Sequence, residues 1–382
     1  MIVRLRWFYF LAYAGVGTWL SYFAPYLRGL GFSGEQIGAV SMAQQLTAVP
    51  AALAWGVFGD RLGTSRALRI CAAGAALAVA GILLARTPLS VGAVLVVAAL
   101  FGPGVVPLVD STTVEALRGG YARTRLFGSL GFVVSAPLLG FVLTLRGDRP
   151  ADLAVPLAYL FCVGGNALLA QGFRPPEEKK FIFSPPHWKE AAALLKSRPL
   201  LWILVVCALH WAALGPYHLM FGVLVRDEGL PSSITGIAMA IGVVAEVGAL
   251  AIFPALEARF SLRALFGTAF LGTVLRWLLL GRAHGAAALV LLQLLHAFTF
   301  GLWWGCAVEA MQRTVPDRLR ASGQALFSAV VFGAGNAVGY ALSGAGYDRF
   351  GSVGPLYTCA AALEVLPLML LLLPLTPGRG RA

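Results

Sequence analysis

Charged side chains are scarce in this chain of 382 residues, where Asp, Glu, Lys and Arg together make up 12%. Soluble globular domains carry about 25% charged and about 45–50% apolar residues. In this chain 59% of the residues are hydrophobic, and the mean hydropathy is +0.80. The composition therefore excludes an ordinary water-soluble domain and predicts a protein that crosses a membrane several times.

Paired cysteines and metal-ligand motifs are also missing. The five cysteines stand singly in apolar segments, where such residues behave as small buried side chains. Neither a nucleophile elbow, a phosphate-binding loop nor a His/Glu set at metal-ligand spacing occurs. We therefore expect no disulfide, no metal, no cofactor and no enzymatic activity.

Apolar segments separated by short charged turns fill most of the sequence. A helix of about 20 residues spans the hydrocarbon core, and only helices satisfy their backbone groups in lipid at this segment length. The segments lie near 5–27, 36–57, 67–85, 90–116, 125–145, 153–172, 199–224, 234–256, 263–281, 286–311, 322–346 and 354–375. The sequence predicts an all-α integral membrane protein of twelve transmembrane helices in two six-helix bundles.

A polar segment with four prolines and many charges, residues 174–198, divides the chain. It predicts an N-terminal bundle at 1–173, a cytoplasmic linker at 174–198 and a C-terminal bundle at 199–382. GVFGDRLGTSRAL (56–68) and PALEARFSLRAL (254–265) occupy corresponding positions in the two halves. Repeated halves are typical of secondary transporters, whose substrate site lies near the membrane midplane between them.

The net charge of +12 first suggests an anionic partner such as nucleic acid. However, most Lys and Arg residues fall in alternate turns, in the linker and at the two ends of the chain. This bias predicts a protein of the bacterial inner membrane with both termini and the linker on the cytoplasmic side. The apolar run after the basic start continues to about Tyr26 without a cleavage site, which favours a retained first helix over a signal peptide. We expect a lipid bilayer and no nucleic acid as partners.

Ionisable residues inside the apolar segments are the candidate functional residues. A charge at membrane depth costs roughly 2.5–3.5 kcal/mol on insertion scales, so it faces a partner or a polar path. Asp110 and Arg125 flank a short basic turn and form a candidate charge pair. The alternative is that Arg125 belongs to the cytoplasmic loop and Asp110 only joins two helices.

Three further ionisable residues, Glu246, Arg276 and His296, lie in three successive apolar segments of the second half. One face of a regular helix would present an imidazole, a hydroxyl and two rings to a cavity, from His296, Thr299, Phe300 and Trp303. Taken singly, the rings suit packing and the histidine suits an interhelical hydrogen bond. A lining role in the cavity is open to His210 and His218, which are eight residues apart near one helix face. A structural role is at least as well supported for both histidines and for Glu364.

The turn between the second and third predicted helices, GVFGDRLGTSR (56–66), resembles the signature loop of the major facilitator superfamily. Ser65 departs from that pattern, which usually has a basic residue there. The resemblance implies a cytoplasmic gate, whereas the plain alternative is a solvated turn. The matching residues are Gly56, Asp60, Arg61, Gly63 and Arg66.

The order of the ionisable residues is similar to that in the oligosaccharide–proton symporter (lactose permease) branch of this superfamily, and to its phenylpropionate-permease-like relatives. The stretches YFAPYL (22–27), RLFGSLGF (125–132) and LLHAFTFG (294–301) carry the same likeness. The resemblance implies that Asp110 and Arg125 hold substrate and that Glu246, Arg276 and His296 serve coupling and substrate contact. That branch has a proton-binding glutamate where this chain has Thr299. The proton carrier is then expected among Glu246, His296 and Asp110, with Glu246 favoured.

These observations predict a monomeric proton symporter for a small polar or aromatic solute, namely a sugar, a nucleoside or an aromatic acid. The rings of Tyr22, Trp303 and Trp304 suit stacking on such a solute, or packing alone. A drug or metabolite exporter is the alternative, because SAPLLG (135–140) faintly resembles an antiporter signature without its flanking glycines. A transport-dead membrane sensor is the third interpretation.

Overall fold

A computed structural model of the chain describes residues 1–117, 120–173, 194 and 196–373. All elements of secondary structure within these ranges are helical. Ten helices of the described part are long and apolar enough to cross a membrane. The prediction of an all-α integral membrane protein is therefore confirmed. The predicted linker lies almost entirely outside the described residues.

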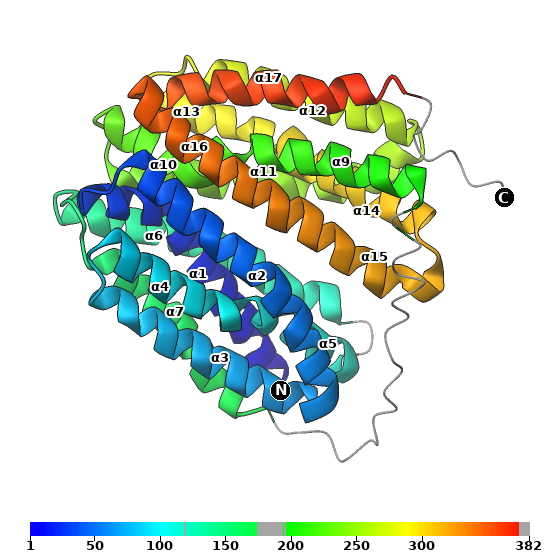
Figure 1. Cartoon of the computed structure of the whole chain (residues 1–382), viewed down its shortest axis with the longest axis horizontal. Coiled ribbons are helices and arrows are strands. Elements are labelled where there is room, and N and C mark those ends of the chain that lie inside the picture. The colour runs from blue at the N-terminus through cyan, green and yellow to red at the C-terminus, as the bar shows by residue number, and fades with distance from the viewer. Residues whose placement is uncertain (118–119, 174–193, 195, 374–382) are drawn as a thin grey trace. The chain divides into compact units, whose positions relative to one another are not determined.

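The first half runs from the N-terminus, blue in Figure 1, through seven α-helices. In this half α1 packs along α6 and α7, while α2 packs along α4. The helices are α1 (Ile2–Gly29), α2 (Gly34–Leu62), α3 (Thr64–Ala80), α4 (Pro88–Phe101), α5 (Val105–Ala116), α6 (Tyr121–Leu145) and α7 (Ala154–Gln171).

The second half contains several helices that are interrupted by 3₁₀ or π turns. A 3₁₀ segment (Leu292–Leu295) and a π segment (Ala297–Leu302) connect α13 to α14, and a π segment (Ser328–Gly335) connects α15 to α16. The helices are α9 (Arg198–Ala213), α10 (Gly215–Asp227), α11 (Ser232–Glu257), α12 (Leu262–Leu280), α13 (Gly285–Leu291), α14 (Trp303–Thr314), α15 (Arg320–Phe327), α16 (Asn336–Phe350) and α17 (Gly354–Leu370).

Several of the ten candidate spans join two consecutive helices, for example α9 and α10 in Arg198–Asp227, and two helices stand outside the ten. The helix α17 is apolar but has only 17 residues, and α1 has 28 residues with charged side chains at both ends. The count of twelve transmembrane helices therefore stays a prediction.

The described residues form two compact units. The first unit holds the residues up to Phe173 together with Gly229–Ala240, and the second holds the described residues from Leu194 to Glu228 and from Ile241 onward. The start of α11 thus groups with helices of the first half. The division of the chain into bundles at 1–173 and 199–382 stays a prediction.

Proline causes the break between α4 and α5. Because Pro103 has no N–H to donate, the helix changes to a 3₁₀ turn over Gly102–Gly104. Two carbonyls next to the break accept side-chain donors instead: Trp55 Nε1 donates to Leu100 O at 2.6 Å and Cys71 Sγ to Phe101 O at 2.6 Å. The break is therefore hydrogen-bonded to α2 and α3 and sets the direction of the helix that carries Asp110.

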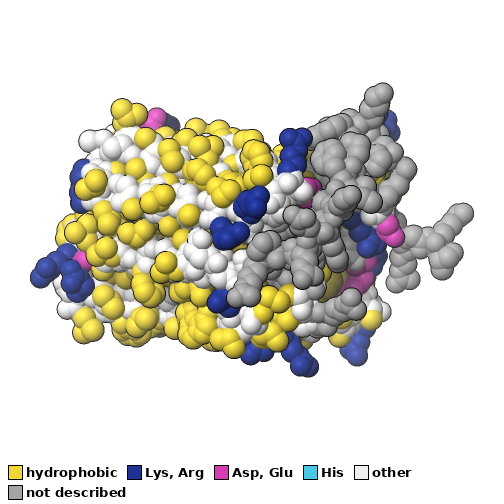
Figure 2. Space-filling model, turned by 90° about the horizontal axis from the view of Figure 1, so that it is seen from below, with side chains coloured by type: hydrophobic (Ala, Val, Ile, Leu, Met, Phe, Trp, Pro, Cys, Tyr) yellow, Lys and Arg dark blue, Asp and Glu magenta, His cyan; other side chains and the backbone are white. Residues whose placement is uncertain are grey.

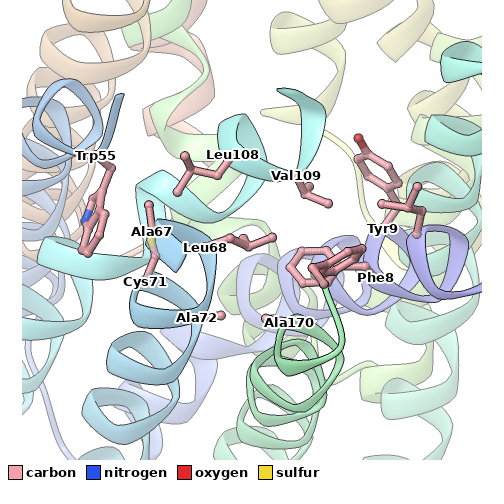
Figure 3. Packing of buried hydrophobic residues seen from close by; sticks show 12 residues of the cluster. Phe8, Tyr9, Trp55, Ala67, Leu68, Cys71, Ala72, Leu108, Val109 and Ala170 are labelled. Carbon is pink, nitrogen blue, oxygen red and sulfur yellow. The ribbon is translucent and has the colours of Figure 1, made fainter. Parts of the chain in front are cut away.

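A buried apolar cluster in the first unit positions Tyr9. Figure 3 shows Phe8 and Tyr9 of α1 beside Val109 of α5 and Ala170 of α7, with side chains of α2 and α3 alongside. Phe8, Tyr9 and Val109 are fully buried. Because Val109 precedes Asp110, the same packing brings Tyr9 next to that carboxylate.

Exposed apolar side chains cover the helices where lipid is expected. In Figure 2 hydrophobic side chains are spread among white atoms over the left part of the visible face, and Lys and Arg lie at its left end, near its centre and along its right half. Large apolar residues such as Leu77 on α3 and Phe161 on α7 are exposed. Contiguous apolar surface of this kind suits contact with lipid tails.

Candidate functional site

Asp110 and Arg125 lie together in the first unit, on α5 and α6. Arg125 Nε is 3.7 Å from Asp110 Oδ1, and about 30% of each side chain is exposed: 31% for Arg125 and 30% for Asp110. The pair predicted from the sequence therefore exists, and both of its side chains are partly exposed. An exposed pair at this distance contributes little stability, which leaves its charges available to a ligand.

Two tyrosines of α1 complete this first cluster. The Tyr9 hydroxyl donates to Asp110 Oδ1 at 2.5 Å, and Arg125 donates to the hydroxyl of Tyr13. The guanidinium also lies over both rings, 4.3 Å from the Tyr13 centroid and 5.4 Å from that of Tyr9. Sequence reasoning missed the tyrosines, although their four-residue spacing on one helix face was a usable signal.

Arg276 is the centre of the second cluster, in the second unit. It is fully buried on α12 and donates to His296 Nδ1 at 2.8 Å and to Gln293 Oε1 at 2.6 Å. Its guanidinium lies 4.3 Å from the ring centroid of Tyr217 and 4.9 Å from that of Trp277. None of the ion pairs among the described residues involves Arg276. The cation is thus surrounded by neutral acceptors and aromatic rings.

His296 connects this cation to Glu246. Because Nδ1 accepts from Arg276, a neutral His296 carries its proton on Nε2. That nitrogen lies 3.6 Å from Glu246 Oε2 on α11, and the glutamate side chain is 19% exposed. The three predicted residues therefore form one row of carboxylate, imidazole and guanidinium, and its carboxylate end is open to solvent.

Thr299 and Trp303 lie in the packed interior of the second unit. The π segment that contains Thr299 breaks the regular helical spacing from which one shared face was predicted. The Thr299 hydroxyl lies 3.3 Å from that of Thr273, and the Trp303 ring stacks on His210 at 4.7 Å. Both residues are fully buried, so contact with a solute requires a conformation in which this interior opens.

Tyr22 belongs to neither cluster. Its buried hydroxyl donates to Ala136 O at 2.7 Å and lies 3.3 Å from Ser232 O. A Cβ added at Gly140 would come within 2.4 Å of the Tyr22 hydroxyl, and one at Gly236 within 2.5 Å. The structure places Tyr22 in close helix packing, and its role in substrate contact stays a prediction.

The signature turn is mostly helical. The helix α2 continues to Leu62, so Gly56, Asp60 and Arg61 lie in its last turns. Gly63 alone connects α2 to α3, with φ at +82°, a backbone conformation that favours glycine. Arg66 follows in the first turn of α3. All five residues are exposed, and their role as a gate stays a prediction.

A family model described as the MFS_1 like family matches residues 2–357. The chain belongs to this family. It is a membrane transporter of the major facilitator superfamily and not an enzyme.

Relatives along nearly the full chain agree with this membership. The chain is 27% identical to the "Probable 3-phenylpropionic acid transporter" of Escherichia coli (strain K12), over 96% of each chain. It is 24% identical to the maltose permease of Geobacillus stearothermophilus, over 96% of this chain and 92% of the relative. The solved nucleoside transporter NupG has the same fold, with a TM-score of 0.83 at 18% identity over 97% of this chain and 98% of that one.

Proposed function

We propose that this transporter moves a small organic anion with an aromatic body, together with protons, by alternating access. The observation that carries the proposal is the buried guanidinium of Arg276, which has neutral hydrogen-bond partners and no carboxylate at ion-pair distance among the described residues. A buried, unpaired charge is costly in a protein interior. A solute carboxylate supplies the missing countercharge and matches the two-pronged guanidinium.

The surroundings of Arg276 favour an aromatic acid over the other solute classes expected from the sequence. The rings of Tyr217 and Trp277 flank the guanidinium, and an aromatic body packs well on such rings. A relative at 27% identity is named for 3-phenylpropionic acid. Maltose and a nucleoside serve as comparison compounds, because other similar proteins are named for maltose and for nucleosides.

Charge balance assigns the coupled proton to Glu246. With Glu246 ionised and Arg276 charged, the empty cluster is neutral. An incoming carboxylate makes it negative unless Glu246 takes up a proton, and a proton without a carboxylate makes it positive. Net charge in a low-dielectric site is unfavourable, so the solute and the proton bind together. His296 lies between the two groups and transmits the linkage.

In this proposal the first cluster serves solute contact within the first unit. Arg125 is partly exposed, and Asp110 and the two tyrosines hold its guanidinium in place. We assign the direction as import across a bacterial inner membrane, with both termini cytoplasmic, a single chain as the working unit and the turn at Asp60 as a gate.

The test is uptake by the purified protein in liposomes with an imposed inward proton gradient. Labelled 3-phenylpropionate, maltose and a nucleoside are offered in parallel. We expect gradient-dependent accumulation of 3-phenylpropionate alone. Accumulation of maltose or the nucleoside instead would overturn the solute class, and proton efflux driven by a cationic drug would establish the exporter alternative.

A further inference from the structure

The second unit contains another acid–base pair, His210 on α9 and Glu364 on α17. His210 Nδ1 lies 2.6 Å from Glu364 Oε1, and His210 Nε2 lies 2.9 Å from the backbone carbonyl of Thr299. Both side chains are 0% exposed. We propose that this pair is a proton-binding site, separate from Glu246, whose proton is taken up and released in each transport cycle.

Hydrogen-bond chemistry determines the number of protons in the pair. The Thr299 carbonyl can only accept, so Nε2 of His210 carries a hydrogen. The 2.6 Å contact on the other side of the ring needs one more hydrogen between Nδ1 and Oε1. Either an imidazolium donates to a carboxylate, or a carboxyl donates to a neutral imidazole. Both forms contain the same single dissociable proton, and both leave the pair neutral.

Loss of that proton would leave two acceptors facing each other in a buried site. The second carboxylate oxygen, Glu364 Oε2, is buried and has no hydrogen-bond partner among the described residues. The rings of Trp303 and Phe270 flank His210, 4.7 and 5.5 Å away between centroids. A deprotonated pair would therefore contain a buried carboxylate charge with neither a countercharge nor a hydrogen-bond donor, so the described conformation retains the proton. Release requires a conformation in which water reaches the pair.

The other titratable groups near the pair do not remove this requirement. The thiol of Cys207 interacts electrostatically with Glu364 and with the thiol of Cys306, and the imidazoles of His218 and His296 interact in the same way with His210. Arg276 donates to His296. The hydrogen bonds of the pair therefore account for one dissociable proton.

The Thr299 carbonyl links the proton to the proposed transport cluster. It belongs to the π segment Ala297–Leu302, which begins directly after His296. Such segments occur frequently at functional sites, where the helix can change its hydrogen-bonding pattern. If the proton leaves, the hydrogen bond between His210 and Glu364 is lost, and the contact of His210 with the π segment changes. Occupancy of the pair thereby biases the position of His296. This coupling rests on the function proposed above.

A second His–Glu pair offers a matched control. His284 Nδ1 lies 3.0 Å from Glu228 Oε1, but the histidine side chain is 81% exposed. Water compensates either charge there, so its protonation needs no conformational change. Glu228→Gln is therefore expected to behave like the wild type in every measurement below, apart from the loss of the signal of the Glu228 carboxyl itself.

The first experiment needs no solute. Wild type, Glu364→Gln and Glu228→Gln are placed in lipid vesicles, and infrared difference spectra are recorded as the pH is raised. We expect a carboxyl or imidazolium signal that is lost at high pH in the wild type and in Glu228→Gln and is absent from Glu364→Gln. Absence of this signal from the wild type, or its persistence in Glu364→Gln, over the range in which the proteins stay folded would overturn the proposal, because the pair would then release no proton.

The second experiment measures the number of protons moved per solute, with 3-phenylpropionate as the probe. We expect two in the wild type and one in Glu364→Gln, while exchange of labelled for unlabelled probe continues. An unchanged ratio would overturn the proposal. If no protein takes up the probe, the proposed function fails and the infrared spectra still decide the proton site. If Glu364→Gln does not fold, His210→Asn combined with Glu364→Gln, an amide pair, replaces it.

Discussion

Arg276 donates to Nδ1 of His296 at 2.8 Å. This one hydrogen bond determines that the other ring nitrogen, the one near Glu246, carries the hydrogen of the neutral imidazole. The guanidinium cannot accept a hydrogen bond, so the neutral imidazole must carry its hydrogen on Nε2. Arg276 therefore determines, through His296, that an N–H group is directed toward the Glu246 carboxylate, although Arg276 itself makes no contact with Glu246. The predictions for the second unit follow from this row of three groups.

Glu246→Gln removes the group that is assigned to carry the coupled proton while keeping nearly the same shape. We expect gradient-driven accumulation of 3-phenylpropionate to fall at least tenfold. Exchange of labelled for unlabelled probe needs no net proton movement and should persist. Both rates are measured in the same proteoliposomes, with Glu228→Gln as the control. Loss of neither activity would remove Glu246 from the mechanism.

Arg276→Lys retains a positive charge but loses the planar pair of donors that reaches His296 and Gln293. An ammonium is not equivalent to a guanidinium at a two-pronged site. We expect the affinity for 3-phenylpropionate to weaken about tenfold or more, which corresponds to at least about 1.4 kcal/mol. Arg282→Lys, at a site where the arginine donates to Leu278 O on the surface, is the matched control. Equal affinities in the two variants would contradict the assignment.

The course of the helices could be predicted largely from segment length and apolarity. The run at 234–256 corresponds to α11 (Ser232–Glu257) and the run at 125–145 to α6 (Tyr121–Leu145). The break of the helix at Gly102–Gly104 also has a local cause, because Pro103 lies within it. These features depend on local sequence, which is why they were accessible.

The features that depend on contacts between distant helices could not be predicted. The run at 286–311 looked like one regular helix, but its 3₁₀ and π segments depend on its packing against other helices. His210 and Glu364 are separated by 154 residues, and only the fold brings them together. A single sequence shows that a histidine and a glutamate are present, but it does not show that the two are in contact. Tyr9 and Tyr13 are different, because their four-residue spacing could have indicated a shared helix face.

Close helix packing in the second unit leaves no room for a methyl group at Gly215. A Cβ there would lie 2.5 Å from backbone atoms of Gly339, which cannot move aside as a side chain can. We expect Gly215→Ala to lower the free energy of unfolding by about 1–3 kcal/mol. Gly248→Ala on α11, where the added Cβ meets nothing within 4 Å, should instead raise it by roughly 0.5–1 kcal/mol. Thermal unfolding in detergent measures both, and equal shifts would contradict the packing.

The connection between α6 and α7 should be sensitive to acid. Burial alone raises the pKa of Asp152, but hydrogen bonds from Arg146 and from the Ala154 backbone, with the charges of Arg146 and Arg149, hold it below its usual value. A lowered pKa in the folded state stabilises the protein above the unfolded pKa of about 3.9. That contribution is lost as the pH falls through the lower, folded value.

Asp152→Asn should therefore reduce thermal stability at neutral pH, and the difference from the wild type should shrink below about pH 4. Asp317→Asn is the control, because the Asp317 side chain is 86% exposed in its ion pair with Arg320. Such a pair contributes almost nothing measurable. A difference between wild type and Asp152→Asn that stays constant with pH would show that the carboxylate charge is not involved.

The Tyr9 hydroxyl tests whether α1 positions the charge pair of the first unit. Tyr9→Phe keeps the ring in its apolar cluster but removes the 2.5 Å hydrogen bond to Asp110. A hydrogen bond to a charged group contributes roughly 1.5–3 kcal/mol, and partial exposure of Asp110 favours the lower end. Tyr357→Phe is the matched control, because that buried hydroxyl has no partner among the described residues and its loss should be neutral or stabilising. A double-mutant cycle with Asp110→Asn isolates the pairwise free energy. Additive effects of Tyr9→Phe and Asp110→Asn would mean that the tyrosine only packs. A coupling of about 1 kcal/mol or more would mean that α1 holds the carboxylate in position for Arg125.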